Sequence, residues 1–350
     1  MKRYDELMPF LLKYENVAWY EDGKIKILDR RVYPREVRYE ICTTYQEVIK
    51  SIQNLVTQSA GPYTAVGMGM ALAAYQSKDL EKDDQIKFLQ KAERELANAR
   101  VTTASRYGQI TSRALEIAIK AIGEGKDPIK PIVDNIIEGL NRRYSTMMAT
   151  GEYLLDLIPE NGTLLTQCYG ETIIGTLIAA SKKTGKNFKV ICAETRPFLQ
   201  GARLTASCFV ESGFDTTIVT DNMIGDIMQK GMVDVFSSAA DSITEDGSVV
   251  NKVGTFQMAL LAKHFKIPYY VTGIPDKGKK TLDDVKIEMR DPEDVLTLGG
   301  IRHAQKGIKG YYPSFDKTPS DLITGVVTDK GVFKSNDLGK YFEISGDDFY

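Results

Sequence analysis

The chain has 350 residues, with 45 Lys and Arg against 47 Asp and Glu, so its formal net charge is −2. This balance excludes the basic excess that is typical of nucleic-acid-binding proteins. Hydrophobic residues make up 43% of the chain and charged residues 26%, a composition of globular proteins with enough apolar material for two domains. No apolar run approaches the roughly 18 residues that span a bilayer, and the N-terminus turns acidic too early for a signal peptide. We therefore expect a cytoplasmic protein that binds neither nucleic acid nor membrane.

The cysteines and histidines argue against a metal site. No C-x-x-C pair occurs, so neither a structural zinc site nor a disulfide framework is predicted. Two histidines, His264 and His303, are too few and too isolated for a His-based triad or metal centre. We expect no metal, no cofactor and free thiols. The cysteines are Cys42, Cys168, Cys192 and Cys208.

The first part of the chain predicts a mainly helical domain with a small β-hairpin. Apolar runs at residues 17–20 and 25–28 flank a Glu21-Asp22-Gly23 turn, which is the pattern of a hairpin. Apolar residues then recur three and four apart, and Gly67-Met68-Gly69-Met70 indicates close helix packing. The predicted helices cover residues 45–52, 65–75, 83–99, 102–122 and 131–157.

The pattern changes after Pro159-Glu160-Asn161-Gly162, where short apolar runs alternate with helical segments. This alternation predicts an α/β fold with a Rossmann-like parallel sheet and helices on both faces. We expect a helical domain over residues 1–145 and a catalytic domain over residues 146–350, with ligands at the carboxyl ends of the strands. Strands are predicted at 163–167, 189–193, 215–220, 233–238 and 269–272, and helices at 172–183, 200–212, 223–230 and 256–265.

Cys168 and Asp241 follow two of these strands and could carry chemistry. A thiol at a helix N-terminus has a lowered pKa, whereas a structural cysteine would simply be buried. Asp241 follows a strand that runs into Ala239-Ala240, where partial desolvation would raise the pKa of the carboxyl for acid–base work. The alternative for Asp241 is a turn or helix-capping residue.

Three further segments could bind an anion. Residues 193–203 follow a strand and open a helix, and residues 251–255 form a polar run before the next helix. Lys252 in that run could meet an anion or could be a solvated surface lysine. Arg100, beside Val101-Thr102-Thr103, has the character of a phosphate clamp.

In order, these segments resemble the methylthioribose-1-phosphate isomerase family over almost the whole chain. Its fold is shared with ribose-1,5-bisphosphate isomerases and with regulatory subunits of the translation-initiation exchange factor. The resemblance lies in Glu194-Thr195-Arg196-Pro197, Gln200 to Ala206, Asn251-Lys252-Val253-Gly254-Thr255, and Pro313 to Pro319 followed by Leu322-Ile323-Thr324-Gly325.

The resemblance implies an isomerase that converts an aldose 1-phosphate to a ketose 1-phosphate in methionine salvage, without metal or cofactor, as a homodimer. Cys168 and Asp241 match the family's catalytic pair. The substrate would be methylthioribose 1-phosphate, 5-deoxyribose 1-phosphate or another pentose 1-phosphate. A non-catalytic sugar-phosphate or nucleotide sensor, resembling the exchange-factor subunits, is the alternative. The implied substrate-binding residues are Ser59, Ala60, Gly61, Arg100, Gln200, Asn251 and Lys252.

The sequence departs from the family pattern beside these residues. Gln167 and Tyr169 replace a His and an Asn around the cysteine, Ser242 replaces an Arg, and Val101 replaces a Pro. The family's Arg-Gly-Ala-Pro phosphate loop appears here as residues 58–62, Gln-Ser-Ala-Gly-Pro, without its arginine. The loss of this cation predicts altered substrate recognition.

Overall fold

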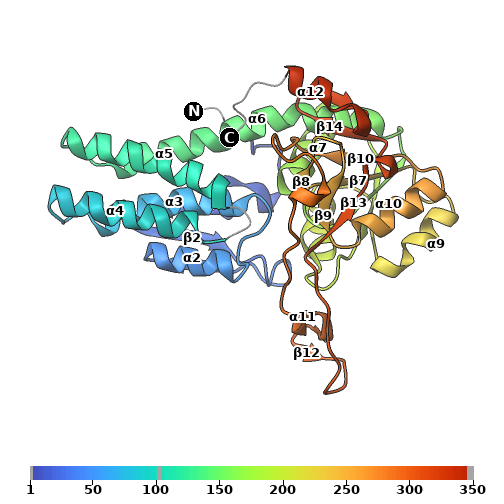
Figure 1. Ribbon diagram of the computed structural model, residues 1–350, viewed down its shortest axis with the longest axis horizontal. Helices are drawn as coiled ribbons and strands as arrows, with labels where there is room; N and C mark the ends of the chain where they lie inside the picture. The colour runs from blue at the N-terminus through green and yellow to red at the C-terminus, as the bar shows by residue number, and fades with distance from the viewer. Residues whose placement is uncertain (1–2, 101–103, 345–350) are drawn as a thin grey trace. The chain divides into compact units, whose positions relative to one another are not determined.

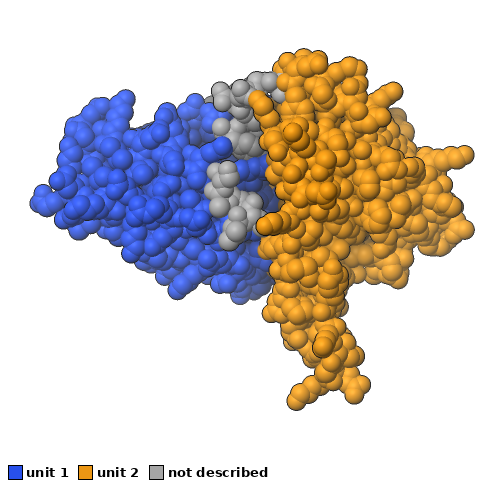
Figure 2. All heavy atoms as spheres, in the orientation of Figure 1, with its two compact units in different colours: residues 1–145, 348–350 blue, residues 146–347 orange. Residues whose placement is uncertain are grey.

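The computed structural model describes residues 3–100 and 104–344, apart from the side chains of residues 104 and 105. The described residues fall into two compact units, unit 1 within residues 1–145 and unit 2 within residues 146–347 (Figure 2). The helix α6 (Ile129–Leu157) contributes residues to both. The predicted helix start at Thr102 and the substitution at Val101 lie outside the described residues.

Unit 1 contains a small antiparallel sheet. The predicted hairpin is confirmed as β1 (Trp19–Glu21) and β2 (Lys24–Leu28). Gly23 closes its turn at a φ of +75°, and a Cβ there would collide with the Tyr75 ring, so only glycine fits. A third strand, β3 (Tyr39–Cys42), pairs with β2 and was not predicted, because its alternating pattern covers only four residues.

The helices of unit 1 form close to where the apolar periodicity predicts them (Figure 1). Thr44 and Glu47 form a capping box that fixes the start of α2, with each side chain bonded to the other's backbone N–H. Four of these helices begin and end within a few residues of the predicted bounds: α2 (Tyr45–Gln53), α3 (Gly61–Gln76), α4 (Lys82–Ala97) and α5 (Ala104–Gly123). Two short helices that were not predicted precede them, η1 (Phe10–Leu12) and α1 (Tyr14–Val17).

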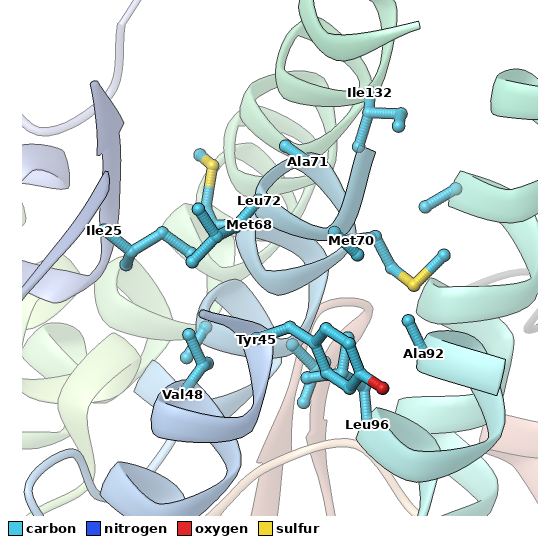
Figure 3. Close-up of a cluster of buried hydrophobic side chains, with 14 of the residues drawn as sticks. Ile25, Tyr45, Val48, Met68, Met70, Ala71, Leu72, Ala92, Leu96 and Ile132 are labelled. Carbon is cyan, nitrogen blue, oxygen red and sulfur yellow. The ribbon is translucent and has the colours of Figure 1, made fainter. Parts of the chain in front are cut away.

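Helix α3 is the centre of the core of unit 1 and is buried on nearly all sides (Figure 3). A Cβ on Gly67 would collide with the side chain of Ile136, and one on Gly69 would lie 2.9 Å from Leu96 Cδ2. The predicted role of these glycines in close helix packing is therefore confirmed. Figure 3 shows Ile25, Tyr45, Val48, Met68, Met70, Leu72 and Leu96 among the buried side chains around α3.

Unit 2 is built on a seven-stranded sheet in the order β15-β14-β10-β7-β4-β5-β6. All neighbours are parallel except the β14–β15 pair, so the predicted Rossmann-like sheet is confirmed. The last two strands on one side of the sheet, β14 and β15, were not predicted. The strands are β4 (Thr163–Thr166), β5 (Lys189–Ala193), β6 (Thr216–Val219), β7 (Val235–Ala239), β10 (Tyr269–Thr272), β14 (Gly325–Thr328) and β15 (Gly331–Phe333).

The strand order reverses between β4 and β7, which makes this the topological switch point of the sheet. Right-handed crossovers that leave β4 in opposite directions place their helices on opposite faces. Accordingly, α7 (Glu171–Thr184) packs against α8 (Ala206–Glu211), and α9 (Ile224–Gln229) packs against α10 (Thr255–His264). A short 3-10 turn, η4 (Asp221–Met223), precedes α9.

A second, three-stranded antiparallel sheet, β13-β9-β8, lies in the same unit. Between β10 and β13 the chain forms an arm that includes η5, α11 and the β11–β12 hairpin (Figure 1). These elements were not predicted. Their bounds, and those of the C-terminal elements, are β8 (Ser242–Ile243), β9 (Val249–Lys252), η5 (Leu282–Asp284), α11 (Glu293–Leu296), β11 (Thr297–Leu298), β12 (Ile301–Arg302), β13 (Phe315–Thr318), η6 (Ser320–Leu322), η7 (Ser335–Asp337) and α12 (Gly339–Ile344).

The single helix predicted over residues 200–212 is wrong in its first part. Residues Gly201–Thr205 form a π-helical turn, η3, and the α-helix begins only at Ala206. Gly201 lies directly against the end of β5, and a Cβ on it would collide with the carbonyl oxygen of Ala193. The spacing of apolar residues in the sequence cannot indicate this close approach, because the approach depends on how the turn at Gly201 packs against the end of β5.

We expect Gly201→Ala to lower the free energy of unfolding by about 1–3 kcal/mol, because the Ala193 carbonyl must move. In the matched control Gly108→Ala, within α5, nothing lies within 4 Å of the added Cβ. The control should therefore be neutral or raise the free energy of unfolding by about 0.5–1 kcal/mol. Urea unfolding of both variants measures the difference, and equal effects would contradict the close approach at Gly201.

Candidate active site

Cys168 and Asp241 follow the two strands that meet at the switch point. Cys168 lies two residues beyond β4, and Asp241 lies two residues beyond β7. These strands pair in parallel, with Leu164 opposite Val235 and Leu165 opposite Phe236, so their carboxyl ends share one edge of the sheet. The structure therefore brings the two residues to neighbouring positions in the crevice where ligands bind in such sheets.

The backbone of Cys168 is held on both sides. Its φ is +57°, a left-handed conformation that few non-glycine residues adopt. The Cys168 N–H donates to Thr195 Oγ1 at 2.8 Å, and the Thr205 hydroxyl donates to the Cys168 carbonyl. Thr195 itself has a φ of +66°, and its N–H donates to Asp221 Oδ1 at 2.8 Å. Left-handed residues of this kind cluster at functional sites, where the surrounding structure fixes them.

Burial raises the pKa of the Cys168 thiol, and this effect is the largest acting on it. The charge of Lys252 lowers that pKa, while the charge of Asp241 raises it. Arg290 also lowers it, with a smaller effect than Lys252. The thiol therefore lies within the electrostatic reach of one carboxylate and two cations, and its proton is retained at neutral pH.

Two expectations about this pair are wrong. Helix α7 begins at Glu171, with Gly170 as its N-cap, so Cys168 precedes the helix and burial outweighs any lowering of its pKa. Asp241 is exposed rather than partly desolvated. The sequence places both residues after their strands, but the depth of each side chain depends on the loops around it.

Asn251 and Lys252 lie in β9 and are both 4% exposed, which rules out the alternative of a solvated surface lysine. The Thr255 hydroxyl joins this segment to the end of β4. It donates to the Lys252 carbonyl at 2.6 Å and accepts from Asn251 Nδ2 at 3.0 Å and from Gln167 Nε2. Gln167 Nε2 also lies 3.2 Å from the Lys252 carbonyl. The residue before Cys168 is thereby locked to the strand that carries Lys252.

Asp316 in β13 is a titratable group that the sequence interpretation did not assign. Its carboxylate accepts from the backbone N–H groups of Gly254 (2.6 Å) and Phe256 (3.2 Å), at the start of α10. Burial raises the pKa of Asp316 to about 6, although these hydrogen bonds and the charge of Lys252 act to lower it. Asp316 belongs to the segment Pro313 to Pro319, which carries part of the family resemblance, but nothing in that segment indicated that its carboxyl would lie at the site.

Arg290 was also missed. Its backbone N–H donates to the Tyr312 carbonyl at 3.0 Å, and Ser314 N–H donates to the Glu288 carbonyl at 2.8 Å, so residues 288–290 run beside the approach to β13. The Arg290 side chain is 13% exposed, and its Nε lies 3.4 Å from Glu288 Oε1. Arg290 and Tyr312, at the two ends of the arm, therefore both lie within electrostatic reach of the Cys168 thiol. No local motif marks Arg290, because it reaches the site only through this pairing.

The remaining predicted residues are divided between the two units. In unit 2, Gln200 is 5% exposed, and its Oε1 accepts no hydrogen bond from the described part of the chain. In unit 1, Gly61 begins α3 and Ala60 is its N-cap, while Ser59 is exposed with a φ of +58°. Arg100 is half-buried in the segment between α4 and α5.

A small cavity lies beside the switch point of unit 2. Its lining is mostly apolar, with a few hydroxyl and amide groups from the carboxyl ends of β4, β7 and β10. Cys168 and Asp241 are not among the residues that line this cavity. The lining residues from these ends and from the start of α7 are Thr166, Gln167, Gly170, Ser237, Ser238, Ala239 and Thr272.

Within residues 3–100 and 104–344, no three or more His, Cys, Asp or Glu side chains are grouped to hold a metal ion. No helix in the same ranges has both the length and the apolar character to cross a membrane.

Comparison with known proteins decides the family. The sequence matches the model of the Initiation factor 2 subunit family over residues 40–335. The chain belongs to this family. The methylthioribose-1-phosphate isomerase of Desulforamulus reducens is 34% identical over 333 residues, which cover 91% of this chain and 95% of that protein. The resemblance to these isomerases that the motifs indicated is thus confirmed.

Two solved structures extend the comparison. The crystal structure of 5-methylthioribose 1-phosphate isomerase from Pyrococcus horikoshii OT3 superimposes with a TM-score of 0.85 at 30% identity, covering 98% of this chain and 99% of that one. The translation initiation factor eIF-2B subunit delta from A. fulgidus gives a TM-score of 0.79 at 32% identity, covering 91% and 95%. Members of the family with different described roles therefore share this fold.

The charges around Cys168 predict opposite effects of two substitutions on its alkylation by iodoacetamide. Lys252→Met removes a charge that lowers the pKa of the thiol and should slow labelling at pH 8, whereas Asp241→Asn should accelerate it. A change of 0.5–1 pKa unit corresponds to roughly 3- to 10-fold in thiolate fraction. Mass spectrometry of the Cys168 peptide measures the rate, with Cys168→Ser as the control. Changes in the same direction would contradict the arrangement.

The raised pKa of Asp316 predicts a pH dependence of stability. The folded carboxyl keeps its proton up to about pH 6, whereas the unfolded carboxyl releases it near pH 3.8. Its contribution to stability is therefore complete below pH 4 and is lost as the pH rises from 4 to 6. Relative to Asp316→Asn, the free energy of unfolding should fall by roughly 1–3 kcal/mol over this interval. Urea unfolding of the unsubstituted protein and of Asp316→Asn at pH 4 and pH 6 measures this change. A difference in free energy of unfolding that is the same at both pH values would contradict the raised pKa of Asp316.

Proposed function

We propose that this chain is an aldose-1-phosphate to ketose-1-phosphate isomerase, an intramolecular oxidoreductase, with methylthioribose 1-phosphate as its substrate. The observation that carries the proposal is the whole-length similarity to proteins named as methylthioribose-1-phosphate isomerases. The placement of Cys168 and Asp241 on neighbouring strand ends supports it, because acid–base chemistry on one sugar needs two groups within reach of adjacent atoms.

In this proposal Asp241 is the general acid. Phosphate on C1 holds the sugar as a closed ring, so no free aldehyde exists until the bond between C1 and the ring oxygen breaks. Asp241 donates a proton to the ring oxygen as that bond breaks, and the carboxylate is reprotonated when the product forms. Substrate bound over the exposed side chain would exclude water from it, which favours the neutral, proton-donating form of a carboxyl.

Cys168 acts in the hydrogen transfer from C2 to C1. Two routes are open. In the first, Cys168 reacts as the thiolate: it takes the proton from C2, which leaves an enolate-like species, and returns that proton to C1. In the second, hydride moves directly from C2 to C1 beside a thiol that keeps its proton throughout. Both routes conserve atoms and electrons within the sugar, and neither consumes a cofactor.

Buried cations and amides bind the substrate in this account. Lys252 and Asn251 lie in β9, and Gln200 precedes the π-helical turn beside Cys168. We assign Ser59, Ala60, Gly61 and Arg100 in unit 1 to phosphate binding. The family resemblance supplies this assignment, and the absence of an arginine from residues 58–62 keeps 5-deoxyribose 1-phosphate and other pentose 1-phosphates as further candidate substrates.

A sugar-phosphate or nucleotide sensor without turnover is the second candidate. The similarity to a structure described as an eIF-2B subunit favours it. The retention of Cys168 and Asp241 at the switch point favours catalysis instead, because a sensor has no need of that pair. Tight binding of a sugar phosphate with no conversion would support the sensor.

Incubation of the purified protein with methylthioribose 1-phosphate, 5-deoxyribose 1-phosphate and ribose 1-phosphate, followed by NMR, tests the proposal. We expect ketose formation with at least one of them. Cys168→Ser and Asp241→Asn should each reduce kcat by about 10²-fold or more, as the loss of a positioned acid–base group does. Cys208→Ser, at a buried cysteine away from the strand ends, is the matched control. Full turnover in both site variants would contradict the assignment.

We further propose that the chain acts as a homodimer in the cytoplasm, as the family resemblance implies. Sedimentation equilibrium over a range of protein concentrations distinguishes a dimer from a monomer of 39.0 kDa.

A further inference from the structure

Helix α3 begins without the groups that normally satisfy a helix N-terminus. It has 16 residues, its N-cap is Ala60, whose side chain makes no capping hydrogen bond, and its first turn contains no acidic residue. Helices of this length usually begin with Ser, Thr, Asp or Asn as the cap, and acidic side chains favour the positive end of the macrodipole. Residues 54–77 contain no Asp, Glu, Lys or Arg. The positive end of α3 is therefore not neutralised by its own segment.

The guanidinium of Arg30 lies against this helix start. Arg30 is fully buried, and its Nη1 donates to the carbonyl of Gln58 at 2.6 Å. The same carbonyl accepts the Gly61 N–H at 3.1 Å, so Arg30 contacts the turn that leads into α3. A Cβ built on Gly61 would lie 3.1 Å from Arg30 Nη1. The backbone N–H of Arg30 donates to the Val56 carbonyl at 2.9 Å, which fixes the arginine to the same segment.

A buried hydroxyl points to the same place. Thr57 is 1% exposed, and its Oγ1 has no hydrogen-bond partner among the residues that the structure describes. A Cβ on Gly61 would collide with this Oγ1, so the hydroxyl is directed at the first residue of α3. A buried hydroxyl without a partner costs free energy and marks a place where a ligand can supply the missing hydrogen bond.

We propose that Arg30 supplies the positive charge of an anion-binding turn at residues 57–61, with the Thr57 hydroxyl as a further ligand group. The anion would be the phosphate of a sugar phosphate, and this identification rests on the proposed function. Arg30 acts through the backbone of the turn. It donates a hydrogen bond to the Gln58 carbonyl and adds a buried positive charge that solvent screens little. It is thus a positioning residue that replaces, from another part of the chain, the cation absent from the turn itself.

Binding of inorganic phosphate to the full-length chain, measured by calorimetry, tests this site without requiring turnover. Arg30→Met should raise the Kd for phosphate by about 10- to 100-fold, because a charge-assisted contribution is lost. Arg30→Lys keeps the charge and should recover part of the affinity. Arg31→Gln is the matched control: it removes the same charge one residue away, from a side chain that pairs with Asp29 and Glu40, and should leave the Kd unchanged.

Thr57→Val separates binding from folding. Because the hydroxyl has no partner in the described part of the chain, its loss should leave the free energy of unfolding unchanged or higher, while the Kd for phosphate rises by roughly 3- to 10-fold. A hydroxyl with a purely structural role would show the reverse. If Arg30→Met fails to fold, phosphate binding by Thr57→Val and Arg30→Lys still tests the anion site.

Kinetics on methylthioribose 1-phosphate distinguish this inference from the proposed function. Arg30→Met should raise KM and leave kcat nearly unchanged, as removal of uniform binding does. If the unsubstituted protein shows no isomerase activity, the proposed function is refuted. If its phosphate binding is nevertheless weakened by Arg30→Met and Thr57→Val, the anion site is retained. Unchanged phosphate affinity in Arg30→Met and Thr57→Val, or no phosphate binding by the unsubstituted protein, would overturn the anion site.

Discussion

The parallel pairing of β4 with β7 is the constraint on which the candidate active site depends. The two strands are separated by about 70 residues of sequence, yet their central positions lie in register, with Leu165 opposite Phe236. Strand order reverses there, and crossover helices leave in opposite directions, so neither helix covers the edge between the two strand ends. Cys168 and Asp241 follow these ends. Their proximity is therefore a consequence of topology, which no local feature of either residue could produce.

A second layer of interactions fixes what surrounds the pair. Hydrogen bonds of Gln167 and Thr255 to the Lys252 carbonyl connect the small sheet of β8, β9 and β13 to the end of β4. The charge of the buried Lys252 in this sheet lowers the pKa of the Cys168 thiol. The Asp241 N–H donates to the Val250 carbonyl at 3.0 Å, so the backbone of Asp241 is attached to the same sheet. These hydrogen bonds thus connect the segments that carry Asp241, Cys168 and Lys252. Such positioning by surrounding structure is what acid–base catalysis requires.

The sequence predicted the architecture well where periodicity is strong. Most helices of unit 1 were predicted from apolar residues three and four apart, and five strands of unit 2 were predicted from short apolar runs between helical segments. Short connections then leave few topologies for these elements. Local sequence patterns did not predict elements whose geometry depends on contacts between segments far apart in the chain. The π-helical turn at Gly201 follows from its approach to Ala193, and the strands β9 and β13 are short segments whose pairing is set by the whole unit.

The candidate site shows the same division. The positions of Cys168 and Asp241 after their strands were predictable, whereas the partial burial of Cys168 and the exposure of Asp241 were not. Arg290 and Asp316 were missed because they reach the thiol and Lys252 through strand pairing between segments far apart in the chain. Arg30 lies outside every motif that the sequence suggested. Its relation to the turn at residues 57–61 appears only once β2 and α3 are folded together.

The most direct test of the central claim is a double-mutant cycle on kcat/KM with Cys168→Ser, Asp241→Asn and the combined variant. If the two side chains act on one sugar at the switch point, their effects are coupled, and the combined variant should be about as slow as the slower single variant. If the losses multiply as independent factors, the thiol and the carboxylate do not act together, and the account of the site is contradicted.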